Sequence, residues 1–152
     1  MQKCTLALGC FWQPEERFKN KPGITDTEVG YAGGESPDVT YKDICKGDTG
    51  HAEVVKLTFN EKIISYEKIL DLFFKMHDPT QKDMQYPDVG KQYRSEIFYE
   101  NEDQKLSAIK IKNELNKKIS GKIETNISKI KNYCKAEEYH QKYIEKNKRW
   151  KI

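Results

Sequence analysis

Short apolar runs separated by turn residues dominate the first half of the chain. Residues 4–8, CTLAL, are apolar on both faces and stop at Gly9, which predicts a short buried strand. In AEVVKLTFN, residues 52–60, apolar and polar side chains alternate, as is typical of a half-buried strand. Further strands are predicted at residues 25–34, 94–100 and 122–130. Between the second and third strands, the glycine- and proline-rich residues 34–50 are expected to form a long surface loop.

Helical patterns connect these strands and become longer in the second half. Pro14 suits a first helical turn, Ser65 is a suitable N-cap, and Asn101 with Gln104 forms a plausible capping pair. Helices are predicted at residues 13–20, from Ser65 to the HDPT sequence at 77–80, at 101–119 and at 136–147. Strands interspersed with helices indicate an α+β sandwich, in which helices pack on one sheet. Because no linker interrupts the pattern, residues 1–152 are expected to form a single domain.

Charge narrows the choice of partners. The net charge of +3 conceals an uneven distribution, because residues 1–100 carry 13 basic and 17 acidic side chains, whereas residues 101–152 carry 14 and 7. The lysine-rich stretch at 109–118 lacks the aromatic or glycine-rich signatures of nucleic-acid binders, so a solvated helix face is expected. No apolar run approaches the roughly 18 residues that a membrane span needs. A cytoplasmic protein without nucleic-acid or membrane partners is therefore expected. A monomer is expected as well, although no sequence pattern addresses the oligomeric state.

Cysteine chemistry is the most informative local feature. The four cysteines show neither CxxC pairs nor zinc-site spacing, so free thiols and no metal are expected. Cys10 lies between a predicted strand and a predicted helix. The amide groups and positive dipole end of that helix favour a thiolate, which predicts a lowered pKa and a nucleophilic role. By position alone, a small buried hydrophobic residue is an equally good interpretation.

Several motifs together resolve this ambiguity. GCFW at residues 9–12 is followed in order by EERF, VGYAGG, TGHAEVV, HDPTQ, DVGKQYRS and AEEYHQKY. This series resembles the A-type peptide methionine-sulfoxide reductases over about residues 6–143. The resemblance implies a ferredoxin-like two-layer α+β sandwich with a mixed sheet and long irregular loops. It also implies thiol-dependent reduction of the S epimer of methionine sulfoxide, free or in oxidised proteins.

The resemblance also assigns roles to individual residues. Cys10 matches the nucleophile, which becomes a sulfenic acid as methionine is released. Glu53 matches the acid that protonates the sulfoxide oxygen, a role that requires burial to raise its pKa well above about 4.3. Tyr41 and Tyr93 match two further donors to that oxygen. The substrate-binding positions are Phe11 and Trp12 as walls of the methyl slot, Asp88 as a substrate-holding carboxylate, and His140 near the site.

The sequence offers more than one route for reducing the sulfenic acid back to a thiol. Many relatives use a second cysteine near the C-terminus, but the final residues 146–152, KNKRWKI, contain none. Cys134 is the main internal candidate, whereas Cys45 and Cys4 are weaker ones. The preferred hypothesis is a cycle with one cysteine and no bound cofactor, in which thioredoxin, or glutathione with glutaredoxin, supplies the thiol. Some relatives carry selenocysteine at the nucleophile position, and the sequence does not show whether Cys10 replaces one.

Two other functions are compatible with parts of the sequence. A cysteine acyl-transfer enzyme would pair its thiol with a histidine, for which His51, His77 and His140 are candidates. A basic binding module would use the lysine-rich second half of the chain.

Overall fold

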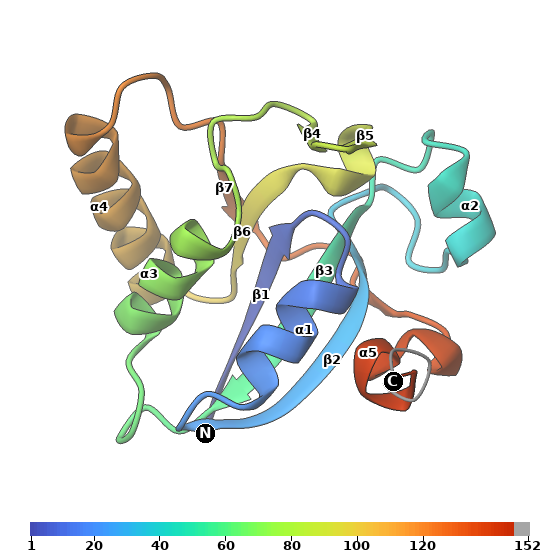
Figure 1. The fold of residues 1–152 in the computed structure, drawn as a ribbon, viewed down its shortest axis with the longest axis horizontal. Helices are drawn as coiled ribbons and strands as arrows, with labels where there is room; N and C mark the ends of the chain where they lie inside the picture. Colours follow the sequence, from blue (N-terminus) through green and yellow to red (C-terminus); the bar gives the residue numbers. More distant parts are fainter. Residues whose placement is uncertain (148–152) are drawn as a thin grey trace.

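One six-stranded sheet organises the chain in a computed structural model that describes residues 1–147 (Figure 1). Its strands lie in the order β7-β6-β1-β3-β2-β8. Their bounds are Gln2–Leu8 for β1, Ile24–Ala32 for β2, Ala52–Phe59 for β3, Ser95–Tyr99 for β6, Asn126–Lys129 for β7 and Cys134–Lys135 for β8. All neighbouring strands are antiparallel except β6 and β7, so the sheet is mixed.

Four of these strands and two helices form the central motif. The helix α1, Trp12–Lys19, connects β1 to β2, and α3, Tyr66–Met76, connects β3 to β6. The order β6-β1-β3-β2 is that of a ferredoxin-like β-α-β-β-α-β unit. After β6, α4, Glu102–Lys118, leads back to β7. The expected α+β sandwich is therefore confirmed.

Alternation along the strands separates the two faces of the sheet. Leu6 and Leu8 of β1 lie in one buried cluster with Val55 and Leu57 of β3 and with apolar residues of α1, α3 and α4. The opposite face carries a smaller cluster that includes Ala7, Ala32, Ala52, Val54 and Phe98. Because side chains alternate with a period of two, Glu53 belongs to the same face as Val55, which is the face that the helices cover.

The helix starts that the sequence predicts are present. The Ser65 hydroxyl accepts from the Lys68 amide at 3.0 Å, and Asn101 Oδ1 accepts from the Gln104 amide at 2.9 Å. These bonds satisfy amide groups that have no partner within their own helix. None of the helices within residues 1–147 combines the length and the apolar character needed to cross a membrane.

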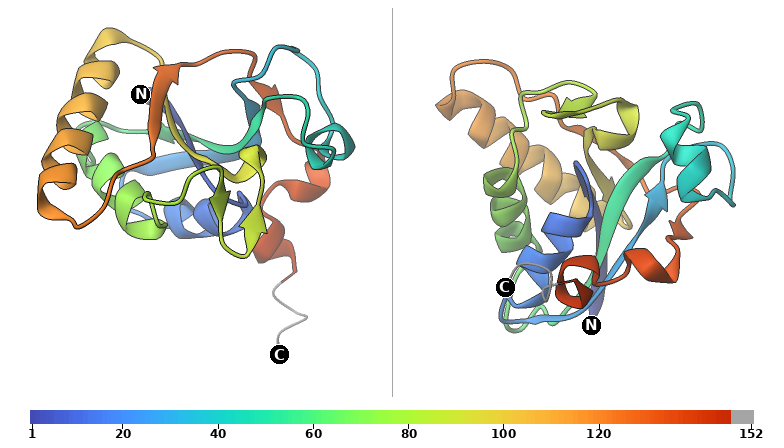
Figure 2. Two further views of the ribbon diagram at one scale, coloured as in Figure 1. Left: turned by 90° about the horizontal axis from the view of Figure 1, so that it is seen from above. Right: turned by 45° about the vertical axis from the view of Figure 1, so that its right-hand side comes forward.

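Several short elements depart from the predicted pattern. The expected loop at 34–50 contains a five-residue helix, α2, Tyr41–Cys45. After α3, a two-stranded hairpin forms from β4, Met84–Gln85, and β5, Asp88–Val89. A 3₁₀ turn, η1, Lys91–Tyr93, follows this hairpin. The predicted helix at 136–147 is wrong as a continuous element. It divides into a 3₁₀ turn, η2, Glu138–His140, and α5, Tyr143–Lys146, and α5 lies against α1 (Figure 2).

The division occurs at Lys142, whose φ of 52° is left-handed. Its amide donates to Glu15 Oε1 at 2.7 Å, and its ammonium group donates to the Thr27 carbonyl at 2.9 Å. These contacts with α1 and β2 hold the backbone in a conformation that a continuous helix could not adopt.

Candidate active site

The turn from β1 into α1 places Cys10 just beyond the C-terminal end of β1, a central strand of the sheet. Gly9 follows β1 with φ of 92°, a conformation that glycine adopts without steric cost. Phe11 is the N-cap of α1, and its side chain makes no capping hydrogen bond. Its amide instead donates to Glu53 Oε1 at 3.2 Å, while the Trp12 amide donates to the Cys10 sulfur. The nucleophile candidate and the acid candidate thus both receive hydrogen bonds from the first amides of α1.

Cys10 is a neutral thiol at rest, so the prediction of a lowered pKa is wrong. Burial raises the pKa of the Cys10 thiol to about 12, and the charges of Glu53 and Asp88 act in the same direction. The hydrogen bond from the Trp12 amide lowers the pKa, but by less than burial raises it. Cys10 is therefore not a thiolate before substrate binds, and its thiol proton has to leave as the sulfur attacks.

Glu53 is a buried carboxyl group that holds its proton near neutral pH. Its side chain is 2% exposed and lies on β3 beneath the turn at Cys10. Burial raises its pKa from 4.5 to about 8, the Phe11 amide opposes this shift, and the charge of Asp88 adds to it. The carboxyl group is therefore suited to donating a proton at physiological pH.

Two tyrosines from separate loops approach the same acid. Tyr41 is the first residue of α2, and Tyr93 is the last residue of η1. Burial raises the pKa of Tyr93 to about 12, with further contributions from Glu53, Asp88 and Cys10. Burial also raises the pKa of Tyr41, and a hydrogen bond with Cys45 and the charge of Glu53 raise it further. Both phenols therefore remain protonated donors within electrostatic reach of Glu53.

Trp12 and Tyr143 form the apolar side of the site. Their rings stack with centroids 3.8 Å apart and an interplanar angle of 9°. A cavity of about 200 Å³ reaches from Cys10 along these two rings to Ile144. Phe11, the other wall that the sequence suggests, is 2% exposed, packs on Tyr31 with ring centroids 5.7 Å apart, and does not line this cavity.

His140 supports the site from behind. It is 1% exposed, and its Nδ1 accepts a hydrogen bond from Trp12 Nε1 at 3.1 Å. Its ring centroid is 4.5 Å from that of Tyr41 and 5.3 Å from that of Phe11. Burial lowers the pKa of His140, so the ring is neutral, and Nδ1 can accept because the proton is on Nε2. His140 therefore positions Trp12 and Tyr41 and does not line either cavity at Cys10.

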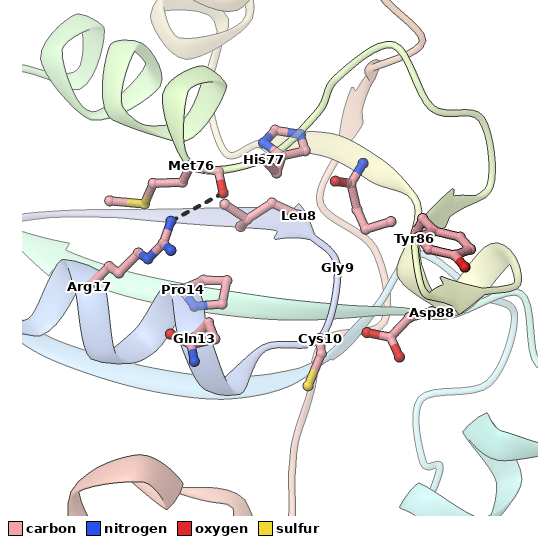
Figure 3. A pocket seen from close by; sticks show the side chains of 11 residues that line it. Leu8, Gly9, Cys10, Gln13, Pro14, Arg17, Met76, His77, Tyr86 and Asp88 are labelled. Carbon is pink, nitrogen blue, oxygen red and sulfur yellow. Dashed lines mark hydrogen bonds between the residues drawn. The ribbon is translucent and has the colours of Figure 1, made fainter.

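Asp88 faces a second cavity that opens at Cys10. This cavity has a volume of about 230 Å³ and extends from Asp88 past Cys10 along α1 (Figure 3). Asp88 lies on β5, in the hairpin that the sequence does not predict. Its carboxylate is placed to accept a hydrogen bond from a substrate in this cavity.

Two supporting residues were missed by sequence reasoning. Glu137 accepts from the Tyr31 hydroxyl at 2.8 Å and from the Tyr41 amide at 2.8 Å, which ties α2 to the sheet. Tyr143 completes the apolar wall with Trp12. Both lie in the AEEYHQKY motif, so the motif was the available signal, although its pattern does not reveal these contacts.

The other cysteines differ in access. Cys4 is fully buried in the main core, Cys45 is exposed, and Cys134 is half-buried on β8. The Cys134 thiol donates to the Val39 carbonyl at 3.5 Å. All four cysteines are free thiols, and Cys134 lies on the edge strand next to β2.

Comparisons with known proteins agree on one family. The sequence profile described as "Peptide methionine sulfoxide reductase" matches residues 2–152. A relative from Pelagibacter ubique, named peptide methionine sulfoxide reductase MsrA, is 56% identical over 146 residues, which covers 96% of this chain and 99% of the relative.

Solved structures show the same likeness. Reduced Mxr1 from Saccharomyces cerevisiae superposes with a TM-score of 0.92 at 44% identity, covering 97% of this chain and 86% of that one. The same yeast protein in complex with Trx2 superposes with a TM-score of 0.67 at 31% identity, covering 93% and 84%. The fold, the motifs and these comparisons point to the same chemistry.

Proposed function

The chain belongs to the peptide methionine sulfoxide reductase family, and from this premise we propose how its own residues divide the reaction between them. Methionine sulfoxide reduction moves one oxygen atom from the substrate sulfur to a thiol of the enzyme. Cys10 is the attacking thiol, Glu53 is the proton donor, and Tyr41 and Tyr93 bind the sulfoxide oxygen. The observation that carries this proposal is the buried Glu53 carboxyl, whose pKa is raised to about 8 and which receives its hydrogen bond from the amide next to Cys10.

The raised pKa values of Cys10 and Glu53 determine how protons move in the reaction. Glu53 donates its proton to the sulfoxide oxygen, which makes the substrate sulfur electrophilic, and the Cys10 sulfur attacks it. The resulting Glu53 carboxylate takes up the thiol proton, so the acid is restored within the same step. As the hydroxyl group passes from the substrate sulfur to the Cys10 sulfur, the substrate S–O bond and the bond between the two sulfurs both break. Cys10 is left as a sulfenic acid, and the substrate is released as the thioether. The enzyme sulfur is oxidised by two electrons, and the substrate sulfur is reduced by two.

Selectivity for the S epimer follows from two unlike sides of the site. The oxygen lies toward Glu53 and the two phenols, and the methyl group lies against Trp12. In the other epimer these two groups exchange places, so a polar oxygen would face an indole ring and lose its donors. A buried oxygen without a hydrogen bond costs about 1–3 kcal/mol, which is roughly one to two orders of magnitude in rate.

A turnover assay on the separated sulfoxide epimers tests these roles. The wild-type enzyme should reduce the S epimer, and its kcat/KM should fall above about pH 8 as Glu53 ionises. Glu53→Gln should lower kcat and remove this decline, because the amide does not titrate. Turnover of the R epimer at the same rate, or an unchanged pH profile in Glu53→Gln, would contradict the assignment.

The hydrogen bonds of the three histidines argue against the alternative function, a cysteine acyl-transfer enzyme. His77 Nδ1 and Nε2 lie 2.7 Å from the Phe73 carbonyl and the Ser95 hydroxyl, respectively, and His51 Nε2 lies 3.1 Å from the Asn132 carbonyl. His140 Nδ1 is occupied by Trp12. Within residues 1–147, no hydrogen bond joins a histidine to Cys10, so the pair that activates an acyl-transfer thiol is not assembled.

For the return to the thiol form, we propose an external reductant. The solved complex of yeast Mxr1 with Trx2 supports a thioredoxin in this role. Cys4 is buried in the core, which argues against it as an internal partner for Cys10. Mass spectrometry after one equivalent of substrate, without reductant, distinguishes the routes. A lone sulfenic acid on Cys10 is expected, and a Cys10–Cys134 disulfide would show an internal route instead.

A further inference from the structure

The cavity that Asp88 lines continues well beyond the reacting groups. From Cys10 it runs along one side of α1, past Pro14, to Arg17 and Met76 (Figure 3). Gln13 and Arg17 are four residues apart, so they lie on the same face of α1. Tyr86, which is 77% exposed, lines the cavity near Asp88. The cavity therefore offers room for groups beyond the sulfoxide itself.

Its charges are separated along this length. Among the lining residues that the structure describes, Arg17 is the only cation and Asp88 the only carboxylate. His77 also lines the cavity, but burial lowers its pKa to about 4, so it is neutral at physiological pH. A ligand in this cavity thus contacts the negative Asp88 near Cys10 and the positive Arg17 at the opposite end of the cavity.

Arg17 retains most of its hydrogen-bonding capacity. The only hydrogen bond recorded for its guanidinium within residues 1–147 runs from Nη1 to the Met76 carbonyl, at 3.4 Å, and no ion pair of Arg17 occurs among these residues. Arg94 differs, because its three nitrogens donate to Glu96 at 2.6 Å, the Lys91 carbonyl at 2.9 Å and the Gly50 carbonyl at 3.0 Å. A guanidinium has five N–H donors, so Arg17 can bind a carboxylate without giving up an existing ion pair.

We propose that Arg17 forms a subsite for an acidic side chain of the oxidised peptide, about two residues from the methionine sulfoxide. This inference rests on the proposed function, because it places the sulfoxide at Cys10. Along the helix axis Arg17 lies about 8 Å beyond Trp12, at 1.5 Å per residue. An extended peptide covers this distance in two to three residues, at about 3.3 Å per residue.

Synthetic pentapeptides with a central methionine S-sulfoxide test this subsite. They carry Glu or Gln two positions before or two positions after the sulfoxide, and their ends are acetylated and amidated. The quantity measured is the ratio of kcat/KM for the Glu peptide to that for the Gln peptide. For the wild-type enzyme at low ionic strength we expect a ratio of about two to five for one of the two flanks, as for a solvent-exposed ion pair, and a smaller ratio at high salt.

Charge variants identify the residue responsible. Arg17→Gln should bring the ratio close to one. Arg17→Glu should reverse the preference, so that a third peptide with Lys in place of Glu is reduced faster than the Glu peptide. The matched control is Lys75→Gln, which removes an exposed positive charge next to Met76 but outside this cavity, and it should keep the wild-type ratio. A wild-type ratio of one, or a preference that survives in Arg17→Gln, would overturn the proposal.

The Gln peptide distinguishes failure of the Arg17 subsite from failure of the proposed reductase function on which the subsite rests. If the wild-type enzyme reduces the Gln peptide without discriminating between charges, only the Arg17 subsite is refuted. If it fails to reduce the Gln peptide and free methionine S-sulfoxide alike, the reductase assignment of Cys10 and Glu53 is refuted, and the subsite falls with it.

Discussion

Glu53→Gln should make the protein more stable at neutral pH while it impairs catalysis. The carboxyl group has a pKa of 4.5 in an ordinary setting and about 8 in the folded protein. Between these two values the folded chain holds a proton that the unfolded chain has already released. Stability therefore falls as the pH rises through this window, by about 1.4 kcal/mol per pH unit. Below the window both states are protonated and above it both are ionised, so this contribution becomes constant.

The size of the effect follows from the width of the window. At pH 7 the buried carboxyl costs the wild-type protein roughly 3 kcal/mol relative to pH 4. Glutamine has no proton to lose, and its Oε1 can still accept the hydrogen bond from the Phe11 amide. The difference in unfolding free energy, variant minus wild type, should therefore grow by about 3 kcal/mol between pH 5 and pH 7.5.

Urea unfolding followed by circular dichroism, with the thiols kept reduced, measures this difference at each pH. Contributions from other titrating groups are shared by both proteins and cancel in the comparison. The matched control is Glu114→Gln on the exposed face of α4, which makes the same chemical change and shows what the loss of one surface charge does. A difference that stays constant with pH, or a variant that is less stable throughout, would refute the placement of a protonated carboxyl beneath Cys10.

Two further predictions concern the thiols and His140. Iodoacetamide should alkylate Cys45 first, Cys10 slowly and Cys4 only on unfolding, because Cys45 is exposed, burial raises the pKa of Cys10 to about 12, and Cys4 is 0% exposed. Time-resolved peptide mass spectrometry checks this order, and Cys10 reacting first would count against the neutral thiol. His140→Phe removes the acceptor for Trp12 Nε1 and should raise KM about fivefold, the equivalent of one hydrogen bond, with a smaller effect on kcat. His140→Asn, whose side-chain oxygen can replace Nδ1, should recover most of the loss in steady-state assays, and an unchanged KM in His140→Phe would exclude the positioning role.

Local sequence signals predicted the central part of the fold. The apolar run that stops at Gly9 corresponds to β1, and the alternation of apolar and polar side chains from Val55 to Phe59 corresponds to β3. The caps at Ser65 and Asn101 formed as expected. These features depend on neighbours within a few residues along the chain, which is why the pattern sufficed.

Features that depend on distant segments were not predictable in this way. The pKa of Cys10 rises because surrounding segments bury it, and this outweighs the local effect of the helix start. The break at Lys142 depends on Glu15, which lies 127 positions away. The choice of Tyr41 and Tyr93 among nine tyrosines came from the family motifs, because composition does not distinguish them.

The short helix α2 is an intermediate case. Thr40 and Asp43 form a capping box at its start, with hydrogen bonds of 3.2 Å and 3.0 Å. This is a local signal, but it was obscured by the glycine and proline residues on both sides of it. The result matters for the site because α2 carries Tyr41 toward Glu53.

A single-turnover experiment tests the central claim most directly. One equivalent of methionine S-sulfoxide is mixed with reduced enzyme in the absence of thiol reductant, methionine is quantified, and dimedone traps any sulfenic acid before mass spectrometry. We predict one methionine released per enzyme, with the dimedone adduct on Cys10, and much slower release from Glu53→Gln. No release of methionine, an adduct on a different cysteine, or an equally fast Glu53→Gln enzyme would contradict attack by Cys10 on a sulfoxide that Glu53 protonates.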